Sequence, residues 1–159
     1  MTADPSDLPL VVDLDGTLIK TDSLDETFLD TLRTEPLALF RLPFKLLAGR
    51  PAAKAFLAGH SSLDVETWPV REDFLAYIKA QAEAGRKVIL ATAADRSVAE
   101  AIRRRFPFIA EIVASRPDGN MKGDAKCRAL LERFPDGFVY AANAAADLAV
   151  WRKGAGSVL

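Results

Sequence analysis

An apolar run, Leu10-Val11-Val12, leads directly into the motif Asp13-Leu14-Asp15-Gly16-Thr17. Side chains two residues apart on an extended strand point the same way, so Asp13 and Asp15 should face one pocket at the strand end. Gly16 allows a sharp turn that exposes backbone N–H groups to an anion. Carboxylates alone would repel a phosphate, but a magnesium ion binds both. The motif therefore predicts a magnesium and phosphate site at the end of a strand.

The rest of the chain alternates predicted strands with predicted helices. Apolar runs predict strands at residues 10–13, 87–92, 111–114, 137–142 and 157–159. Helical periodicity predicts helices at residues 71–84, 98–106 and 122–134. This alternation predicts an α/β fold with a Rossmann-like parallel sheet covered by helices on both faces. Ligands of such sheets bind at the carboxyl ends of the strands, where the Asp13 motif lies.

A long segment between the first two predicted strands interrupts the alternation and has the pattern of several short helices. Its first helix is predicted to begin at Ser23, which forms a capping-box pattern with Glu26. We expect residues 1–22 and 66–159 to form the α/β core domain. Residues 23–65, called the cap below, should form a small helical lid over the strand ends.

Composition limits the class of protein. The chain has 159 residues, of which 50% are hydrophobic, and this suits one domain with a proper core. The net charge of -1 argues against nucleic-acid binding. Cys127 is the one cysteine, which excludes an internal disulfide and a cysteine-based zinc site. Residues 1–7 do not resemble a secretion signal, and residues 36–47 are too short and too interrupted to span a bilayer, so we expect a cytoplasmic location.

Further polar residues lie where predicted strands or their following loops end. The Thr92 hydroxyl and the N–H of Ala93 are placed to hold a phosphate oxygen, and Lys122 is placed to add positive charge. Asn143 and Asp147 follow a later strand. Each residue alone has an ordinary structural explanation, such as helix capping or solvation. Their order along the chain is what indicates a common site.

In this order the motifs resemble the haloacid dehalogenase (HAD) superfamily of phosphohydrolases across nearly the whole chain. The pair Lys122-Gly123 and its distance from Asn143 are similar to the phosphoserine phosphatase branch. The segments VDLDGTLIKTD, ATAADRS, NMKGDAK and ADLAVW resemble the soluble domain that precedes a UbiA-type prenyltransferase in some bacterial fusion proteins. That resemblance implies covalent fusion to a membrane prenyltransferase domain.

The resemblance implies a role for each matching residue. Asp13 would be the nucleophile that forms an aspartyl-phosphate, and Asp15 would protonate the leaving alcohol and then activate water. The Asp13 carboxylate, the Asp15 backbone carbonyl and Asn143 would hold Mg²⁺. Asp15 favours phosphoester hydrolysis over dehalogenation, which needs no such acid. Both carboxyl groups should be partly solvated at the strand ends.

The same resemblance assigns the phosphoryl oxygens to Thr92, Ala93 and Lys122. Lys126, one helical turn further on, is the competing lysine, and Lys122 is preferred because it matches the Lys-Gly pattern and is predicted to open the helix. The expected substrate is a phosphomonoester, with a polyprenyl-linked or sugar phosphate as the narrower hypothesis.

The last motif departs from that of active relatives. Where they commonly have Gly-Asp-Ser, this chain has Ala142-Asn143-Ala144, with Asp147 retained to orient Asn143 or Lys122. The site thereby loses a formal negative charge and some metal affinity. This loss motivates an alternative function, in which a catalytically weakened domain binds phosphate within a larger membrane prenyltransferase protein.

The cap combines positive charge with apolar residues. The segment from Arg33 to Lys54 contains five basic residues and one acidic residue, Glu35. Leucine and phenylalanine residues are interspersed in the same segment. One interpretation is that the apolar residues build the interior of the cap. The other is that they contact a membrane surface at its cytoplasmic face, with the basic residues near anionic headgroups.

Overall fold

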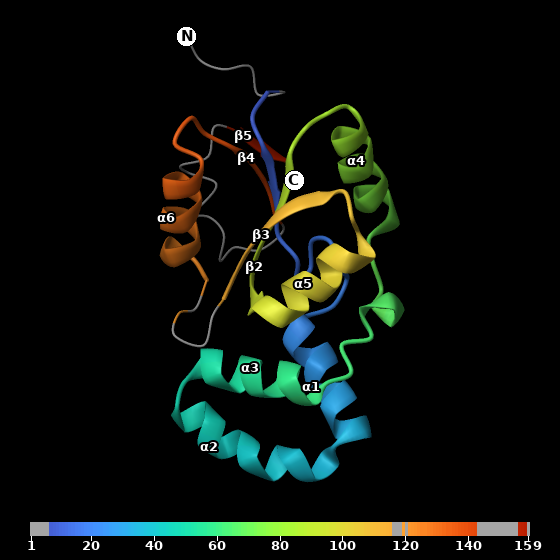
Figure 1. The fold of residues 1–159 in the computed structure, drawn as a ribbon, viewed down its shortest axis with the longest axis vertical. Coiled ribbons are helices and arrows are strands. Elements are labelled where there is room, and N and C mark those ends of the chain that lie inside the picture. Colours follow the sequence, from blue (N-terminus) through green and yellow to red (C-terminus); the bar gives the residue numbers. More distant parts are fainter. Residues whose placement is uncertain (1–6, 116–118, 120, 143–155, 159) are drawn as a thin grey trace.

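The computed structural model describes residues 7–115, 119, 121–142 and 156–158. Five parallel strands form one sheet in the order β3-β2-β1-β4-β5 (Figure 1). The strands are β1 (Leu10–Val12), β2 (Val88–Asp95), β3 (Ile109–Ser115), β4 (Val139–Ala141) and β5 (Gly156–Val158). The predicted α/β fold with a parallel sheet is confirmed. Because β1 lies at the centre of the sheet, the Asp13 motif that follows it is also central.

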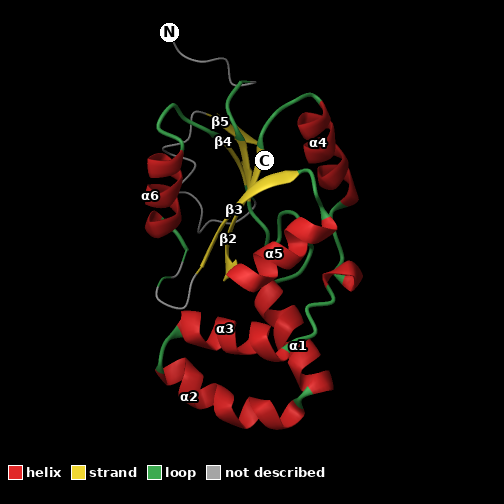
Figure 2. Ribbon diagram, viewed as in Figure 1, coloured by secondary structure: helices red, strands yellow, loops and turns green. Residues whose placement is uncertain are grey.

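Helices cover both faces of the sheet, as Figure 2 shows. Helices α4 (Glu72–Glu83) and α5 (Arg96–Arg105) lie on one face, and α6 (Asp124–Arg133) lies on the other. Alternate residues of β1 enter two separate core clusters: Leu10 and Val12 pack with residues of α4 and α5, whereas Val11 packs with residues of α6. Burial on both faces explains why the strands are continuous apolar runs.

The cap connects β1 to β2 and lies at one end of the molecule, beyond the strand ends (Figure 1). It contains α1 (Ser23–Thr34), the 3₁₀ helix η1 (Pro36–Arg41), α2 (Leu42–Leu47) and α3 (Arg50–His60). A second 3₁₀ helix, η2 (Val65–Thr67), follows. Asp30 on α1 accepts hydrogen bonds from the hydroxyls of Ser61 and Ser62, at 2.7 and 2.8 Å, and so fixes the end of α3 against α1. The predicted helical insertion after the first strand is confirmed.

One predicted helix cap and one predicted helix start are wrong. Helix α1 begins at Ser23, as predicted. The N-cap of α1 is Asp22, whose carboxylate accepts a hydrogen bond from Leu24 N at 2.8 Å, so Ser23 is the first helical residue and not the cap. Helix α6 begins at Asp124 because Gly123 before it adopts a positive φ of 55°. Lys122 therefore lies in the loop before α6 and does not open the helix.

Candidate active site

A cavity of about 440 Å³ lies between the carboxyl ends of the strands and the cap. Core residues Asp13, Asp15 and Lys126 line it from the sheet side, while Arg50 and Lys54 line it from α3 of the cap. The cavity is strongly charged, because five lysine or arginine and four aspartate side chains line it. Such a set of side chains suits a small, highly charged ligand.

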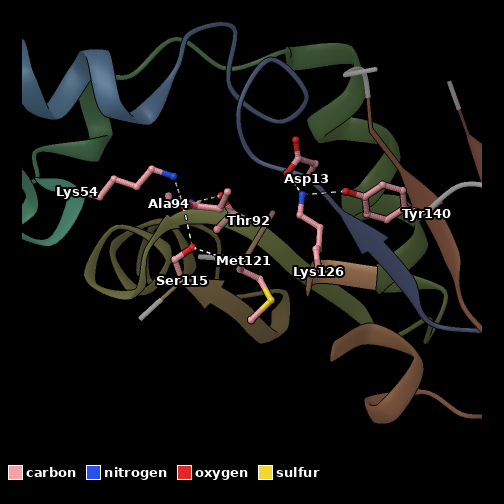
Figure 3. A network of polar contacts seen from close by, with 9 residues as sticks. Asp13, Lys54, Thr92, Ala94, Ser115, Met121, Lys126 and Tyr140 are labelled. Carbon is pink, nitrogen blue, oxygen red and sulfur yellow. Dashed lines mark hydrogen bonds and ion pairs between the residues drawn. The ribbon is translucent and has the colours of Figure 1, made fainter. Parts of the chain in front are cut away.

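A buried ion pair lies at the base of this site. Lys126 Nζ donates hydrogen bonds to Asp13 Oδ1 at 2.9 Å and to Tyr140 Oη at 3.0 Å (Figure 3). Only 6% of Asp13 and 2% of Lys126 are exposed. The expectation that Asp13 is partly solvated is wrong, because β1 is central and α6 places Lys126 over the strand end. A positive charge beside a carboxylate favours its ionised form, which an attacking carboxylate requires.

Asp15 has a different environment from Asp13, although both line the cavity. Its Oδ1 accepts a hydrogen bond from Ser23 N, at the start of α1, at 2.7 Å. Burial raises the pKa of Asp15 above the ordinary value of 3.8, and the hydrogen bond from Ser23 opposes that rise. A carboxyl group with a raised pKa holds its proton more readily, which suits a general acid. The two aspartates thus have different environments, as a nucleophile and a general acid that act together require.

The turn between the two aspartates and the cap depends on Gly16. Its φ of 68° lies in the left-handed region, which a residue with a Cβ adopts only with strain. Gly16 N donates to Thr21 O at 3.2 Å, and this bond folds the loop back on itself. The loop returns to α1 at the position where Ser23 contacts Asp15. The predicted sharp turn at Gly16 is confirmed. The expectation that it exposes N–H groups to an anion is wrong for Gly16 and Thr17, whose N–H groups donate to Thr21 O and Leu14 O.

The end of β2 is irregular at the predicted phosphate-binding residues. Strand β2 does not end at Thr92 but continues to Asp95, with a shift in its register against β3 between these residues. Thr92 is fully buried, and its Oγ1 accepts a hydrogen bond from Ala94 N at 3.0 Å. Ala93 and Ala94 line the cavity. In this structure the Thr92 hydroxyl is therefore engaged within its own strand, and the following residues face the cavity.

Lys54 is a site residue that sequence reasoning did not identify. From α3 of the cap, its Nζ donates a 2.5 Å hydrogen bond to Ala93 O on β2, and Ser115 Oγ donates to the same oxygen at 3.0 Å (Figure 3). Burial lowers the pKa of Lys54 below 10.5, while the charges of Asp15 and Asp22 act in the opposite direction. In the sequence, Lys54 is only a basic residue of the cap. Its contact with Ala93 could not be predicted, because the tertiary fold alone sets the distance between positions 54 and 93.

The remaining predicted site residues have different outcomes. Lys122 is exposed and lines the cavity. Lys126, the competing lysine, is the one that contacts Asp13. Asn143 and Asp147 lie outside the described residues, so their predicted roles at the metal remain predictions.

The described residues supply part of a site for a hard cation. Asp13 and Asp15 both line the cavity, and carboxylate and backbone carbonyl oxygens, the groups assigned to Mg²⁺ in these two residues, are its preferred ligands. Thr21 also lines the cavity, and its buried Oγ1 has no hydrogen-bond partner within the described part of the chain. Residues 7–115, 119, 121–142 and 156–158 contain no group of three His, Cys, Asp or Glu side chains placed to hold a metal. The donors present fit Mg²⁺, and the predicted third ligand is the amide oxygen of Asn143.

Comparison with known proteins identifies the family. The sequence-family model of the haloacid dehalogenase-like hydrolases matches residues 10–152 of this chain. The chain belongs to this family of enzymes. The uncharacterized protein y4nM of Sinorhizobium fredii is 41% identical over 152 residues, in a match that covers 96% of this chain and 30% of that protein. The HAD chain thus spans less than a third of the length of this relative.

Solved structures share the fold. Phosphoserine phosphatase in its apo form has a TM-score of 0.63 and 14% identity, and the match covers 94% of this chain and 84% of that one. A phospho-aspartyl intermediate analogue of phosphoserine phosphatase has a TM-score of 0.64 and 15% identity, with the same coverage. A protein with unknown function from Bordetella pertussis has a TM-score of 0.63 and 17% identity, covering 91% of this chain and 85% of that one. The predicted HAD fold and its similarity to phosphoserine phosphatase are confirmed.

Proposed function

We propose that this HAD hydrolase is a magnesium-dependent phosphatase that cleaves phosphomonoesters through an aspartyl-phosphate. One observation carries the proposal: two aspartates at one strand end share a cavity but have opposite environments. Asp13 is paired with the buried ammonium of Lys126, whereas burial raises the pKa of Asp15. A nucleophile and a general acid need this difference, since the first must be ionised and the second must carry a proton.

The proposed reaction has two steps. Asp13 attacks phosphorus through a carboxylate oxygen, and the bond from phosphorus to the alcohol oxygen breaks as Asp15 transfers its proton to that oxygen. Asp15, now ionised, takes a proton from a water molecule that attacks the phosphorus of the aspartyl-phosphate. This second displacement releases inorganic phosphate and restores Asp13. Mg²⁺, held by Asp13, the Asp15 backbone carbonyl and Asn143, would offset the negative charge that carboxylates and phosphate bring together.

Positive side chains would bind the phosphoryl oxygens. Between the two candidate lysines the geometry favours Lys126, because its ammonium lies 2.9 Å from Asp13 Oδ1 while Lys122 is exposed. Arg50 and Lys54 add charge from the cap side of the cavity. In this proposal the N–H of Ala93 at the end of β2 supplies a further donor. A phosphate monoester thus meets cations or N–H donors from both the core and the cap.

For the substrate, we propose a polyprenyl-linked or sugar phosphate. Support comes from the resemblance to the domain joined to UbiA-type prenyltransferases. This chain also shares its fold with proteins described as phosphoserine phosphatase. The phosphate ester of a small amino acid is therefore the natural comparison substrate. Fusion to a membrane prenyltransferase remains a hypothesis, which the length and hydropathy of the native open reading frame would test.

Release of phosphate from p-nitrophenyl phosphate tests the proposed chemistry. We expect turnover with Mg²⁺ and its loss when EDTA removes the metal, because the carboxylates would then repel the substrate. Calorimetry with inorganic phosphate distinguishes an active phosphatase from a domain that only binds phosphate. Phosphate binding without turnover of any of several phosphomonoesters would favour the catalytically weakened phosphate-binding domain. Absence of both would contradict a phosphate site altogether.

A substitution at Asn143 tests the predicted metal ligand. Asn143→Asp should tighten Mg²⁺ binding by about tenfold, because a carboxylate replaces a neutral amide beside a hard cation. Calorimetric titration of the wild type and the variant with MgCl₂ measures the change. Gln81→Glu, on helix α4, is the matched control for an amide replaced by a carboxylate. Equal affinity in wild type and Asn143→Asp would mean that Asn143 is not a ligand.

A further inference from the structure

The cap carries an unusual apolar surface. Within the described part of the chain, all the large hydrophobic side chains that are exposed belong to the cap: Phe28, Leu29, Leu32, Leu37, Phe40, Phe44, Leu46 and Leu47. Monomeric proteins rarely expose so many large apolar side chains on one small unit. Their gathering on the cap, and not on the sheet-covering helices, indicates a contact surface.

Four of these residues form a stripe on one helical segment. Helices η1 and α2 follow one another without a break, and α2 lies at the end of the molecule most distant from the sheet (Figure 1). The apolar stripe consists of Leu37, Phe40, Phe44 and Leu47, spaced three, four and three residues apart, which places them on one side of a helix. Their exposed fractions lie between 71% and 86%. The stripe therefore faces away from the protein.

The stripe is not the interior of the cap. The half-buried residues of the same segment, Leu39 and Leu42, supply its inward face. The interpretation that all apolar residues of this segment build the cap's own core is therefore wrong for the stripe. A stripe of this kind needs a partner that covers it, since burial of these four side chains within the chain does not occur in this structure.

Charge indicates which partner fits. Arg33, Arg41, Lys45 and Arg50 are exposed in and beside this segment, and Glu35 is the one acid between positions 33 and 50. A second copy of the chain would bring these like charges together across a symmetric interface, which is unfavourable. An anionic lipid surface complements both features, because acyl chains accept the apolar side chains while headgroups neutralise the basic ones.

We propose that the cap docks on an anionic membrane surface through the apolar stripe, with Arg41 and Lys45 at the headgroups. This inference is independent of the proposed phosphatase activity. The described residues contain no helix long and apolar enough to cross a bilayer. Helix α3 lies between α2 and the sheet in Figure 1, and its residues Arg50 and Lys54 line the cavity. Docking would thus place the cap side of the cavity near the membrane.

Co-sedimentation of the 159-residue chain with lipid vesicles tests the proposal. At low salt we expect at least about tenfold more binding to vesicles with phosphatidylglycerol than to phosphatidylcholine alone, and loss of that preference at high salt. The double variant Phe40→Ser/Phe44→Ser should bind neither kind of vesicle. Arg41→Glu/Lys45→Glu should lose the preference for anionic lipid. The matched charge reversal on core helices, Lys79→Glu/Arg104→Glu, should bind as the wild type does.

Circular dichroism must show that every variant is folded, and two outcomes would overturn the proposal. The first is a wild type that shows no preference for anionic vesicles at low salt. The second is a wild type that forms dimers in analytical ultracentrifugation, binds no vesicles and becomes monomeric in Phe40→Ser/Phe44→Ser, since the stripe would then be an interface between copies. Neither result depends on phosphate release, so failure of the phosphatase proposal would leave this test intact.

Discussion

Asp13→Asn is expected to lower kcat for p-nitrophenyl phosphate by about 10⁴-fold or more, because an amide cannot form the aspartyl-phosphate. Asp15→Asn should lower kcat for p-nitrophenyl phosphate to a comparable extent only if proton transfer to the leaving group limits the rate. It should therefore affect an alkyl phosphate, whose leaving group needs the proton, more than p-nitrophenyl phosphate. Initial rates of phosphate release with both esters measure these effects.

The Asp13→Asn variant should remain folded, since the asparagine Oδ1 can still accept the hydrogen bond from Lys126. Thermal unfolding followed by circular dichroism provides the control. Glu100→Gln, on helix α5, is a matched loss of one carboxylate that does not line the cavity and should leave turnover unchanged. A folded Asp13→Asn variant that retains wild-type turnover would contradict covalent catalysis by this residue.

Lys126→Met is expected to lower the free energy of unfolding of the metal-free protein by about 3–5 kcal/mol, because it leaves the Asp13 carboxylate buried without its ammonium partner. Urea unfolding in EDTA measures the change. Lys122→Met is the matched control: Lys122 is exposed, so the same substitution there should change stability by less than about 0.5 kcal/mol.

A double-mutant cycle separates the ion pair from general packing. If Asp13 and Lys126 interact as the structure indicates, Asp13→Asn/Lys126→Met should be more stable than the sum of the single changes predicts. Additive effects would mean that Lys126 acts through its packing on Tyr140. The folded single variants also compare the two lysines as phosphate ligands, since the greater rise in KM should follow loss of the lysine that binds phosphate.

The sequence by itself determined the α/β fold, the parallel sheet, the cap between the first two strands and the presence of Asp13 and Asp15 at one site. These features depend on local patterns: apolar runs form strands, helical periodicity forms helices, and two carboxylates two residues apart on a strand end share a direction. Helix boundaries were less accurate. The choice of Asp22 as the N-cap of helix α1 and the positive φ of Gly123 both depend on the path of the chain beyond the local sequence.

Only the tertiary structure decided which side chains meet. Lys126 is 113 positions from Asp13, and the packing of α6 on the sheet brings them together, whereas motif spacing favoured Lys122. The contact of Lys54 with Ala93 and the exposure of the apolar stripe also depend on how the cap sits beyond the strand ends. Sequence patterns report periodicity along one element. Distances between elements, and the burial that raises the pKa of Asp15, arise only when those elements pack.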